Sequence, residues 1–361
     1  MNKPDLPARG PIAPRRPSQS HHHGIDRDDD YAWLRADNWQ VVMRDPAVLP
    51  QDIRAHLEAE NAFTKAAMGD TEALQETLFA EMKGRIKEDD SSVPAPDGPF
   101  CYYTRFVTGG QQPLFCRRPR GCGEETILID GNALAEGHAY FRIAQVAHSP
   151  DHRRIAYAVD TKGSEYFTAK VIDAETGAVV EEAITDTCGG LEWAMDSETL
   201  LHVWLDEEHR PRKLFAHKIG DAGGDRLIHD QTDPGLFLDI SLTQDGKYLL
   251  LGTHDHETSE VSLIDAADPY AQPRLVAPRE TEHEYSVCHH EGRLIILTNS
   301  GGAEDFRIVE APADNPGPTN WTEIEPHRPG RLILDITAFK DFLVRLEREN
   351  GLPRIVIRRL T

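Results

Sequence analysis

Residues 243–255, TQDGKYLLLGTHD, contain a polar turn, an apolar run of strand-forming residues and a second polar turn. The same plan recurs in HSPDHRRIAYAVD (from His148), AMDSETLLHVWLD (from Ala194), HHEGRLIILTNSG (from His289) and FKDFLVRLERENG (from Phe339). Successive turn residues are 45, 49, 47 and 49 positions apart, and they are Asp151, Asp196, Asp245, Gly292 and Asp341. A period near 47 with about four short strands per unit predicts a β-propeller.

A further strand-like run follows each repeat. These runs are FTAKVIDAETG, KLFAHKIGD, EVSLIDAADP, DFRIVEAPAD and PRIVIRRLT. The pattern gives an opening unit at about 100–138, four full units and a sixth unit that stops before its fourth strand. We therefore expect an incomplete propeller over residues 100–361.

The segment upstream of the repeats has a different character. Residues 1–27 carry five prolines and no apolar periodicity, so we expect them to be disordered or extended. Residues 28–95 are predicted to form an N-terminal strap and two helices, at 51–68 and 71–87. In the second helix, four apolar residues recur every four positions, with Asp70 or Thr71 as the expected N-cap; they are Leu74, Leu78, Met82 and Ile86.

Composition excludes several classes of partner. Against 39 Lys and Arg stand 61 Asp and Glu, a net charge of −22, which disfavours nucleic acid and anionic membranes but suits basic peptides. We find neither a signal-peptide pattern nor an apolar run long enough to span a membrane. The cysteines are scattered without metal-ligand spacing, which favours reduced thiols and a cytoplasmic location; they are Cys101, Cys116, Cys122, Cys188 and Cys288.

Motifs for catalysis or cofactor binding are not found in the sequence. A hydrolase nucleophile is expected within GxSxG, and the nearest approach is Gly163–Ser164 in TKGSEYF, which we interpret as a hairpin turn. There is also no phosphate-binding or dinucleotide-binding glycine motif. We therefore predict no catalytic, cofactor-binding or metal residue in the chain, and no cofactor.

The histidines were considered as metal ligands. His254 and His256 would share one face of a strand, but no third ligand is evident. His289–His290 and His283 in EHEYSV are interpreted as structural residues of strands. The run His21, His22 and His23 is interpreted as solvated, with adventitious metal binding as the alternative.

Several stretches that the propeller pattern does not explain resemble a known family. DYAWLR at 30–35, with HHG upstream, resembles the N-terminal signature of the prolyl oligopeptidase family of serine peptidases. EALQETLFAEMKGRIKEDDSSVP (72–94), EHEYSV (282–287) and TNSGGAEDFRIVEAP (298–312) are similar to its oligopeptidase B branch. The resemblance extends from about residue 15 onward.

The resemblance implies a seven-bladed propeller that caps an α/β-hydrolase domain, onto which the N-terminal segment wraps. It also implies cleavage of short peptides after Arg or Lys by a Ser–Asp–His triad in the hydrolase domain. No position of this chain matches a catalytic residue of the family. On this reading the chain is an all-β propeller of the seven-bladed type, truncated in the sixth blade, with an α-helical and extended strap and no C-terminal α/β-hydrolase domain.

Two interpretations follow. The chain is the gating cap of an oligopeptidase B-like endopeptidase, a fragment that is inactive alone and whose partners are short basic peptides and its own or a separate hydrolase domain. Alternatively, it is a stand-alone propeller that binds peptides or proteins. Under the first interpretation, Tyr31, Trp33, Leu34 and Trp39 of the strap are expected to be under-packed, because the domain they would contact is missing.

Overall fold

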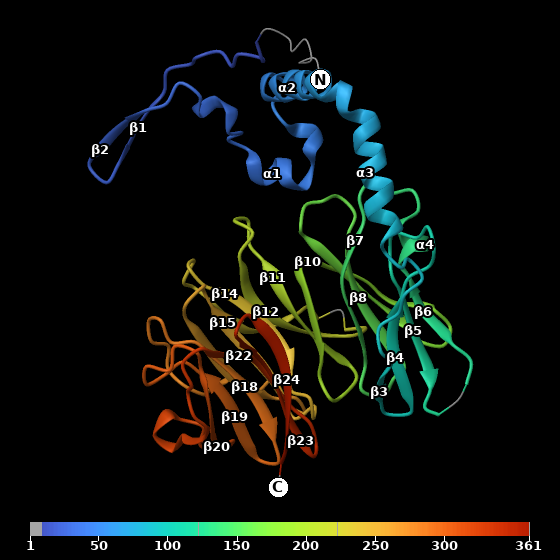
Figure 1. Cartoon of the computed structure of the whole chain (residues 1–361), viewed down its shortest axis with the longest axis vertical. Helices are drawn as coiled ribbons and strands as arrows, with labels where there is room; N and C mark the ends of the chain where they lie inside the picture. Colours follow the sequence, from blue (N-terminus) through green and yellow to red (C-terminus); the bar gives the residue numbers. More distant parts are fainter. Residues whose placement is uncertain (1–8, 122, 222, 361) are drawn as a thin grey trace. The chain divides into compact units, whose positions relative to one another are not determined.

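The computed structural model describes residues 9–121, 123–221 and 223–360 (Figure 1). The chain divides into two compact units, and each is described by itself. The first comprises residues 1–138 and 162–164, and the second comprises residues 139–161 and 165–361. The α-helices belong to the first unit and most of the strands to the second.

The first unit contains an exposed hairpin near its N-terminus. Strands β1 (Gln19–His22) and β2 (Ile25–Asp28) pair antiparallel, and His23 and Gly24, with φ of 53° and 77°, form the turn between them. Positive φ at both turn positions matches the right-handed twist of a two-stranded hairpin. The segment is therefore extended, one of the two states expected for it, and its pairing is a feature that the sequence did not predict.

The helices of the first unit follow the hairpin. The two long helices were predicted at 51–68 and 71–87, and they are α2 (Gln51–Met68) and α3 (Glu72–Gly84). The short helical segments are η1 (Ala32–Leu34), α1 (Trp39–Arg44), η2 (Pro46–Val48) and η3 (Gly69–Thr71).

The predicted cap of α3 is wrong. Thr71 occupies the N-cap position but makes no capping bond; its hydroxyl donates to the Met68 carbonyl at 2.7 Å and accepts from Gln75 Nε2 at 2.7 Å. A capping residue needs a non-helical backbone, whereas Thr71 has φ −96° and ψ −4°. The turn η3 leads directly into α3, so no such residue separates the two.

A four-stranded antiparallel sheet completes the first unit. Its strands lie in the order β3 (Ala95–Asp97), β4 (Phe100–Arg105), β5 (Leu114–Pro119) and β6 (Thr126–Asp130), and α4 (Gly131–Ala135) follows. Asp130 caps α4 by accepting from the backbone N–H groups of Asn132 and Ala133. Arg105 of β4 forms two-pronged hydrogen bonds with Glu125, which hold the pKa of that carboxyl down to about 2.

The second unit consists of antiparallel sheets that follow one another in chain order (Figure 1). One seven-stranded sheet contains β7 (Arg142–His148), β8 (Arg154–Asp160), β9 (Phe167–Asp173), β10 (Val179–Trp193), β11 (Thr199–Leu205), β12 (Pro211–Lys218) and β13 (Arg226–Asp230). The next contains β14 (Phe237–Leu242), β15 (Tyr248–His254), β16 (Ser259–Asp265) and β17 (Arg274–Leu275). The last two contain β18 (Tyr285–His290), β19 (Arg293–Thr298), β20 (Arg307–Pro312) and β21 (Thr322–Glu325), then β22 (Arg331–Ala338), β23 (Phe342–Glu349) and β24 (Leu352–Arg359).

The seven-stranded sheet is two four-strand sets that share one strand. The 15-residue β10 pairs with β9 along its first part and with β11 along its second, and its register shifts between Thr187 and Leu191. Gly189 lies at this shift with φ 93°, and a Cβ there would lie 2.5 Å from the Ala144 Cβ of β7. Glycine therefore permits both the bend of β10 and its close approach to β7.

Hydrophobic side chains join consecutive sheets. Leu201 and Val203 of β11 pack in one cluster with Leu238 of β14 and Leu251 of β15, all of them buried. Side chains also hydrogen-bond between strands that do not pair with each other, across about one repeat of sequence. Trp193 Nε1 donates to the Ala147 carbonyl at 3.1 Å, and the two residues are 46 positions apart.

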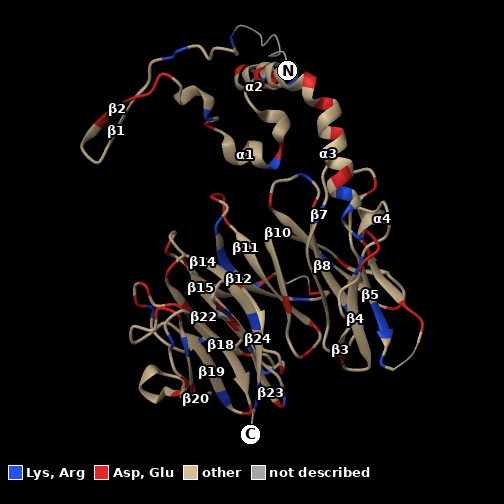
Figure 2. Cartoon of the chain, viewed as in Figure 1, with Lys and Arg blue, Asp and Glu red and all other residues tan. Residues whose placement is uncertain are grey.

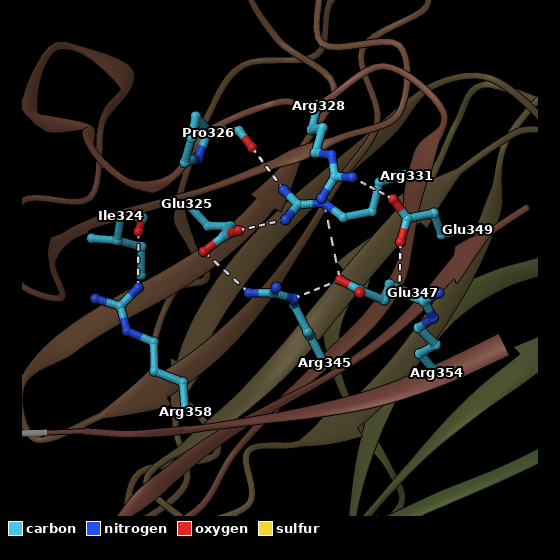
Figure 3. Close-up of polar contacts among 10 residues, drawn as sticks. All are labelled: Ile324, Glu325, Pro326, Arg328, Arg331, Arg345, Glu347, Glu349, Arg354 and Arg358. Atoms are coloured by element: carbon cyan, nitrogen blue, oxygen red, sulfur yellow. Dashed lines mark hydrogen bonds and ion pairs between the residues drawn. The ribbon is translucent and has the colours of Figure 1, made fainter.

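The contact between the last two sheets combines a cluster of buried apolar residues with a group of ion pairs (Figure 3). Glu325 of β21 contacts Arg331 at 2.7 Å and Arg345 at 3.1 Å, and Glu347 of β23 contacts the same two arginines at 4.0 and 2.8 Å. The four side chains form a closed ring of alternating charge. Arg331 and Glu347 are buried, so removing one charge would leave its neighbours uncompensated in a poorly solvated place.

Candidate functional site

A pocket of about 300 Å³ opens between two consecutive sheets of the second unit. One wall comes from β14, β15 and β16, and the other from β18, the first strand of the next sheet. Leu250, Val261 and Val287 give these walls an apolar surface, and Asp239 supplies a carboxylate. A volume near 300 Å³ is at the lower end of the range for ligand pockets.

The alternation of β14 places Asp239 in this pocket. Its neighbours Leu238 and Ile240 are buried in the core, so Asp239 points to the opposite face of the strand. In the register of β14 and β15, Asp239 lies across from Gly252. A Cβ at residue 252 would lie 2.5 Å from Asp239 Oδ2, so glycine leaves the space that the carboxylate occupies.

The charge of Asp239 is only partly compensated. Its Oδ2 lies 3.2 Å from His254 Nδ1, and the side chains of both residues are about half exposed. Burial raises the pKa of Asp239 above its ordinary value, and this effect exceeds the opposing effect of His254. The half-exposed carboxylate can be reached from solvent, and a cation brought to it would stabilise its charged form.

Tyr285 gives the pocket a fixed floor. Its hydroxyl accepts from the Val261 N–H at 2.8 Å and donates to the Ala277 carbonyl at 2.8 Å. Its backbone N–H donates to Ser259 Oγ at 2.6 Å. Burial raises the pKa of Tyr285 to about 12, so the hydroxyl stays protonated and the two sheets stay linked.

One argument from the sequence about the pocket histidine is wrong. His254 and His256 were expected to share a strand face, but β15 ends at His254 and His256 lies in the following turn. The ionic partner of His254 is Asp239 on the neighbouring strand. Across the described ranges 9–121, 123–221 and 223–360, no group of three or more His, Cys, Asp or Glu is arranged to hold a metal ion.

The other singled-out histidines make structural contacts. His289 Nδ1 lies 2.5 Å from Asp245 Oδ2, and its Nε2 accepts from the Gly292 N–H. His290 Nε2 hydrogen-bonds the Lys340 carbonyl at 3.0 Å. His283 is buried just before β18, with Nε2 2.9 Å from Thr298 Oγ1, and His289 and His290 end that strand. The run His21, His22 and His23 lies on the exposed hairpin, where His21 pairs with Asp26 at 2.6 Å.

Gly163–Ser164 lies in the connection between the antiparallel strands β8 and β9, so its interpretation as a hairpin turn is confirmed. Gly163 has φ 76°, and Ser164 is buried. A nucleophile elbow would need an exposed serine and a following helix, and neither is found here.

Cys101, Cys116, Cys188 and Cys288 are free thiols, buried or partly buried, whereas Cys122 lies outside the described residues. Burial raises the pKa of the Cys116 and Cys288 thiols to about 11, so these two are held in the unreactive protonated form.

A second candidate surface lies on α3 of the first unit. Leu74, Leu78 and Met82 of the predicted stripe lie on α3, whereas Ile86 lies beyond the end of the helix at Gly84. All four are exposed, as is Phe79, with exposed fractions between 46% and 66%. None of the residues of α3 is buried. A contiguous exposed apolar stripe of this size is typical of a docking surface.

The strap around Tyr31 is held within its own unit. The Trp33 ring lies 4.0 Å from the guanidinium carbon of Arg16, and its Nε1 donates to the Pro14 carbonyl at 2.9 Å. Arg16 in turn bonds Asp52 of α2 at 2.6 Å and lowers the pKa of that carboxyl. Tyr31 is exposed and Trp33 partly buried, which agrees with the expected incomplete packing; what covers the strap stays a prediction.

Acidic residues are spread over the molecule and recur in the loops between strands (Figure 2). Among the described residues, no helix is both long and apolar enough to cross a membrane.

Comparison with known proteins supplies a family context. Residues 11–361 match the family model described as prolyl oligopeptidase, N-terminal beta-propeller domain. A dipeptidyl aminopeptidase BI of Pseudoxanthomonas mexicana is 33% identical over 92% of this chain, and a protease 2 of Moraxella lacunata is 29% identical over 96%. The match covers 47% and 49% of these relatives, so the chain spans about half of their length.

Solved structures give the same result. Oligopeptidase B from Leishmania major superposes with a TM-score of 0.88 at 28% identity. Oligopeptidase B from Trypanosoma brucei, with covalently bound antipain in a closed form, superposes with a TM-score of 0.87 at 30% identity. Each match covers 98% of this chain and 51% of the other.

Proposed function

Because the chain belongs to the prolyl oligopeptidase family, as its N-terminal β-propeller domain, we propose that it is the gating cap of an oligopeptidase B-like serine endopeptidase. In this proposal the substrates are short peptides cleaved after Arg or Lys. The Ser–Asp–His triad belongs to an α/β-hydrolase portion that these 361 residues do not contain. The single observation that carries the proposal is the match of nearly the whole chain to about half of an oligopeptidase B.

The structure of the first unit supports a cap that docks onto another domain. The exposed apolar stripe on α3 has the composition of a surface that is buried in a larger assembly. In the proposed enzyme, the sheets described above belong to a seven-bladed propeller of which the β22–β24 sheet is the sixth. The propeller keeps folded proteins out and admits short peptides, and its opening and closing can limit turnover.

The experiment compares this chain with a version extended along its own reading frame. We expect the 361-residue chain not to hydrolyse a fluorogenic peptide with a blocked N-terminus and Arg before the scissile bond. The extended protein is expected to hydrolyse it and to react with a fluorophosphonate probe at serine. A stop codon directly after Thr361, together with a chain that binds peptides, would instead support the stand-alone binding module.

A matched pair of substrates tests the type of cleavage. One relative is named a dipeptidyl aminopeptidase, so a peptide with a free N-terminus and Arg at its second position is the comparison. Cleavage of the blocked peptide at a similar or higher rate is expected for an endopeptidase. Cleavage confined to the free-amine peptide would reject the endopeptidase proposal in favour of dipeptide release.

A further inference from the structure

We propose that the pocket between β14–β16 and β18 binds the side chain of an Arg or Lys residue of a peptide. The choice of a peptide as ligand rests on the proposed function, whereas the cationic chemistry follows from the pocket itself. The site would give the propeller its own preference for basic peptides, in addition to any preference of a catalytic portion.

The shape of the pocket fits a long side chain with a polar end. Leu250, Val261 and Val287 line it with aliphatic groups, against which the methylene stem of Arg or Lys can pack. Tyr285 is held by hydrogen bonds to β16 and to Ala277 in the connection that follows β17, so the cavity is preformed. A preformed cavity lowers the ordering cost of binding.

The charge of the pocket selects a cation. Asp239 lies against Gly252 and has one ionic partner, His254, on one of its oxygens. Glu260 lies across from Thr253, which lies across from the buried Leu238, so its side chain belongs to the opposite face of the sheet, where its Oε2 accepts from the Arg279 backbone N–H at 3.0 Å. A guanidinium or ammonium group can hydrogen-bond the Asp239 carboxylate, whereas an anionic side chain would be repelled.

The test measures binding and requires no hydrolysis. Isothermal titration calorimetry of the 361-residue chain compares acetyl-Ala-Arg-Ala-amide with the same peptide carrying citrulline, which has the shape of Arg without its charge. We expect the Arg peptide to bind about tenfold more tightly, the size of effect that one charge-assisted hydrogen bond can give. Equal affinities, or no detectable binding of either peptide, would overturn the proposal.

Variants locate the effect. Asp239→Asn keeps the shape of the side chain and is expected to abolish the preference for Arg over citrulline. Glu257→Gln, an exposed residue in the β15–β16 turn, removes the same charge nearby and should leave the preference unchanged. A preference that survives Asp239→Asn, or that falls equally in Glu257→Gln, would show that the pocket is not the site.

The outcome is separable from that of the proposed function. If the chain binds Arg peptides through Asp239 but the extended protein fails to cleave after Arg, the pocket proposal stands and the endopeptidase proposal is rejected. Cleavage after Arg by the extended protein, without charge-dependent binding at Asp239, would do the reverse.

Discussion

The side-chain amide of Gln145 makes two hydrogen bonds to the backbone of Leu191, one repeat further along the chain. Its Nε2 donates to the Leu191 carbonyl at 2.7 Å, and its Oε1 accepts from the Leu191 N–H at 3.0 Å. The two residues are 46 positions apart, within the range of spacings between the repeat turns. The period in the sequence is thus also the distance along the chain between groups that touch.

Replacing Gln145 with Leu should destabilise the second unit. The change keeps the size of the side chain but leaves the buried N–H and C=O of Leu191 without partners, at a cost of about 1–3 kcal/mol. Urea unfolding followed by circular dichroism measures the loss. Gln244→Leu, at an exposed turn position, is the control and should stay within about 0.5 kcal/mol of the parent. A loss no larger than that of the control would contradict the structural role of the clamp.

The sequence repeat predicted that the sheets exist, whereas the length of β10 and the contacts between strands depend on how the strands pair in three dimensions. Each unit repeats because it packs on the next, so the apolar runs recur with the spacing of the contacts. The continuity of β10 was not predictable, since Gly189–Gly190 looks like a turn and instead allows a bend within one strand. The pair Asp239–His254 was missed because cross-strand neighbours depend on register, which the sequence of one strand does not give.

Glu192 should make stability depend on pH. Burial raises its pKa from 4.5 to about 7, so the folded state holds a proton that the unfolded state releases at lower pH. The stability associated with this proton is complete below about pH 4.5 and is lost as pH rises through 7. Glu192→Gln should flatten the melting temperature between pH 5 and 8 and raise it by a few degrees (roughly 2–4 °C) at pH 8.

Thermal melts at several pH values, with the exposed Glu257→Gln as control, check this expectation. The control should retain the pH profile of the parent. A Glu192→Gln variant with the same slope as the parent would show that another group is responsible.

The charged ring between the last two sheets predicts a large effect from one neutralisation. Glu347→Gln leaves Arg331 and Arg345 with one carboxylate between them in a buried place, which should cost about 3–5 kcal/mol. Glu323→Gln is the matched control, because its ion pair with Arg307 is 3.4 Å long and more exposed than the ring. The control should lose at most about 1 kcal/mol. Similar losses in the two variants, measured by urea unfolding, would argue against a buried network.

The apolar stripe on α3 should make the isolated chain self-associate. Leu78→Glu with Met82→Glu is expected to lower binding of the dye ANS and to shift the chain toward monomer in size-exclusion chromatography with light scattering. Because both side chains are exposed, the unfolding midpoint should hardly change.

A control with the same added charge separates apolar contact from repulsion. Ala73→Glu with Ala80→Glu places two carboxylates on the opposite face of the same helix, where both alanines are exposed. This control should leave association unchanged. Monomeric behaviour of the unmodified chain, or equal effects of the two pairs, would remove the case for a docking surface.

The net charge of −22 predicts electrostatic steering in the proposed enzyme. Cationic peptides should be drawn to the cap over several ångströms, which raises their rate of association at low salt. In a protein that carries both portions, kcat/KM for an Arg peptide of net positive charge should fall as ionic strength rises to about 0.15 M, where the Debye length is about 8 Å. Neutral peptides should respond weakly.

Removing surface charge should reduce that slope. The triple variant Glu257→Gln, Asp268→Asn and Asp314→Asn changes three exposed acidic residues and spares the pocket carboxylate Asp239. Its salt dependence for the cationic peptide should be shallower, because fewer charges act at a distance, while activity on the neutral peptide stays the same. Equal salt responses for cationic and neutral peptides in the parent would show that the acidic cap does not steer substrates.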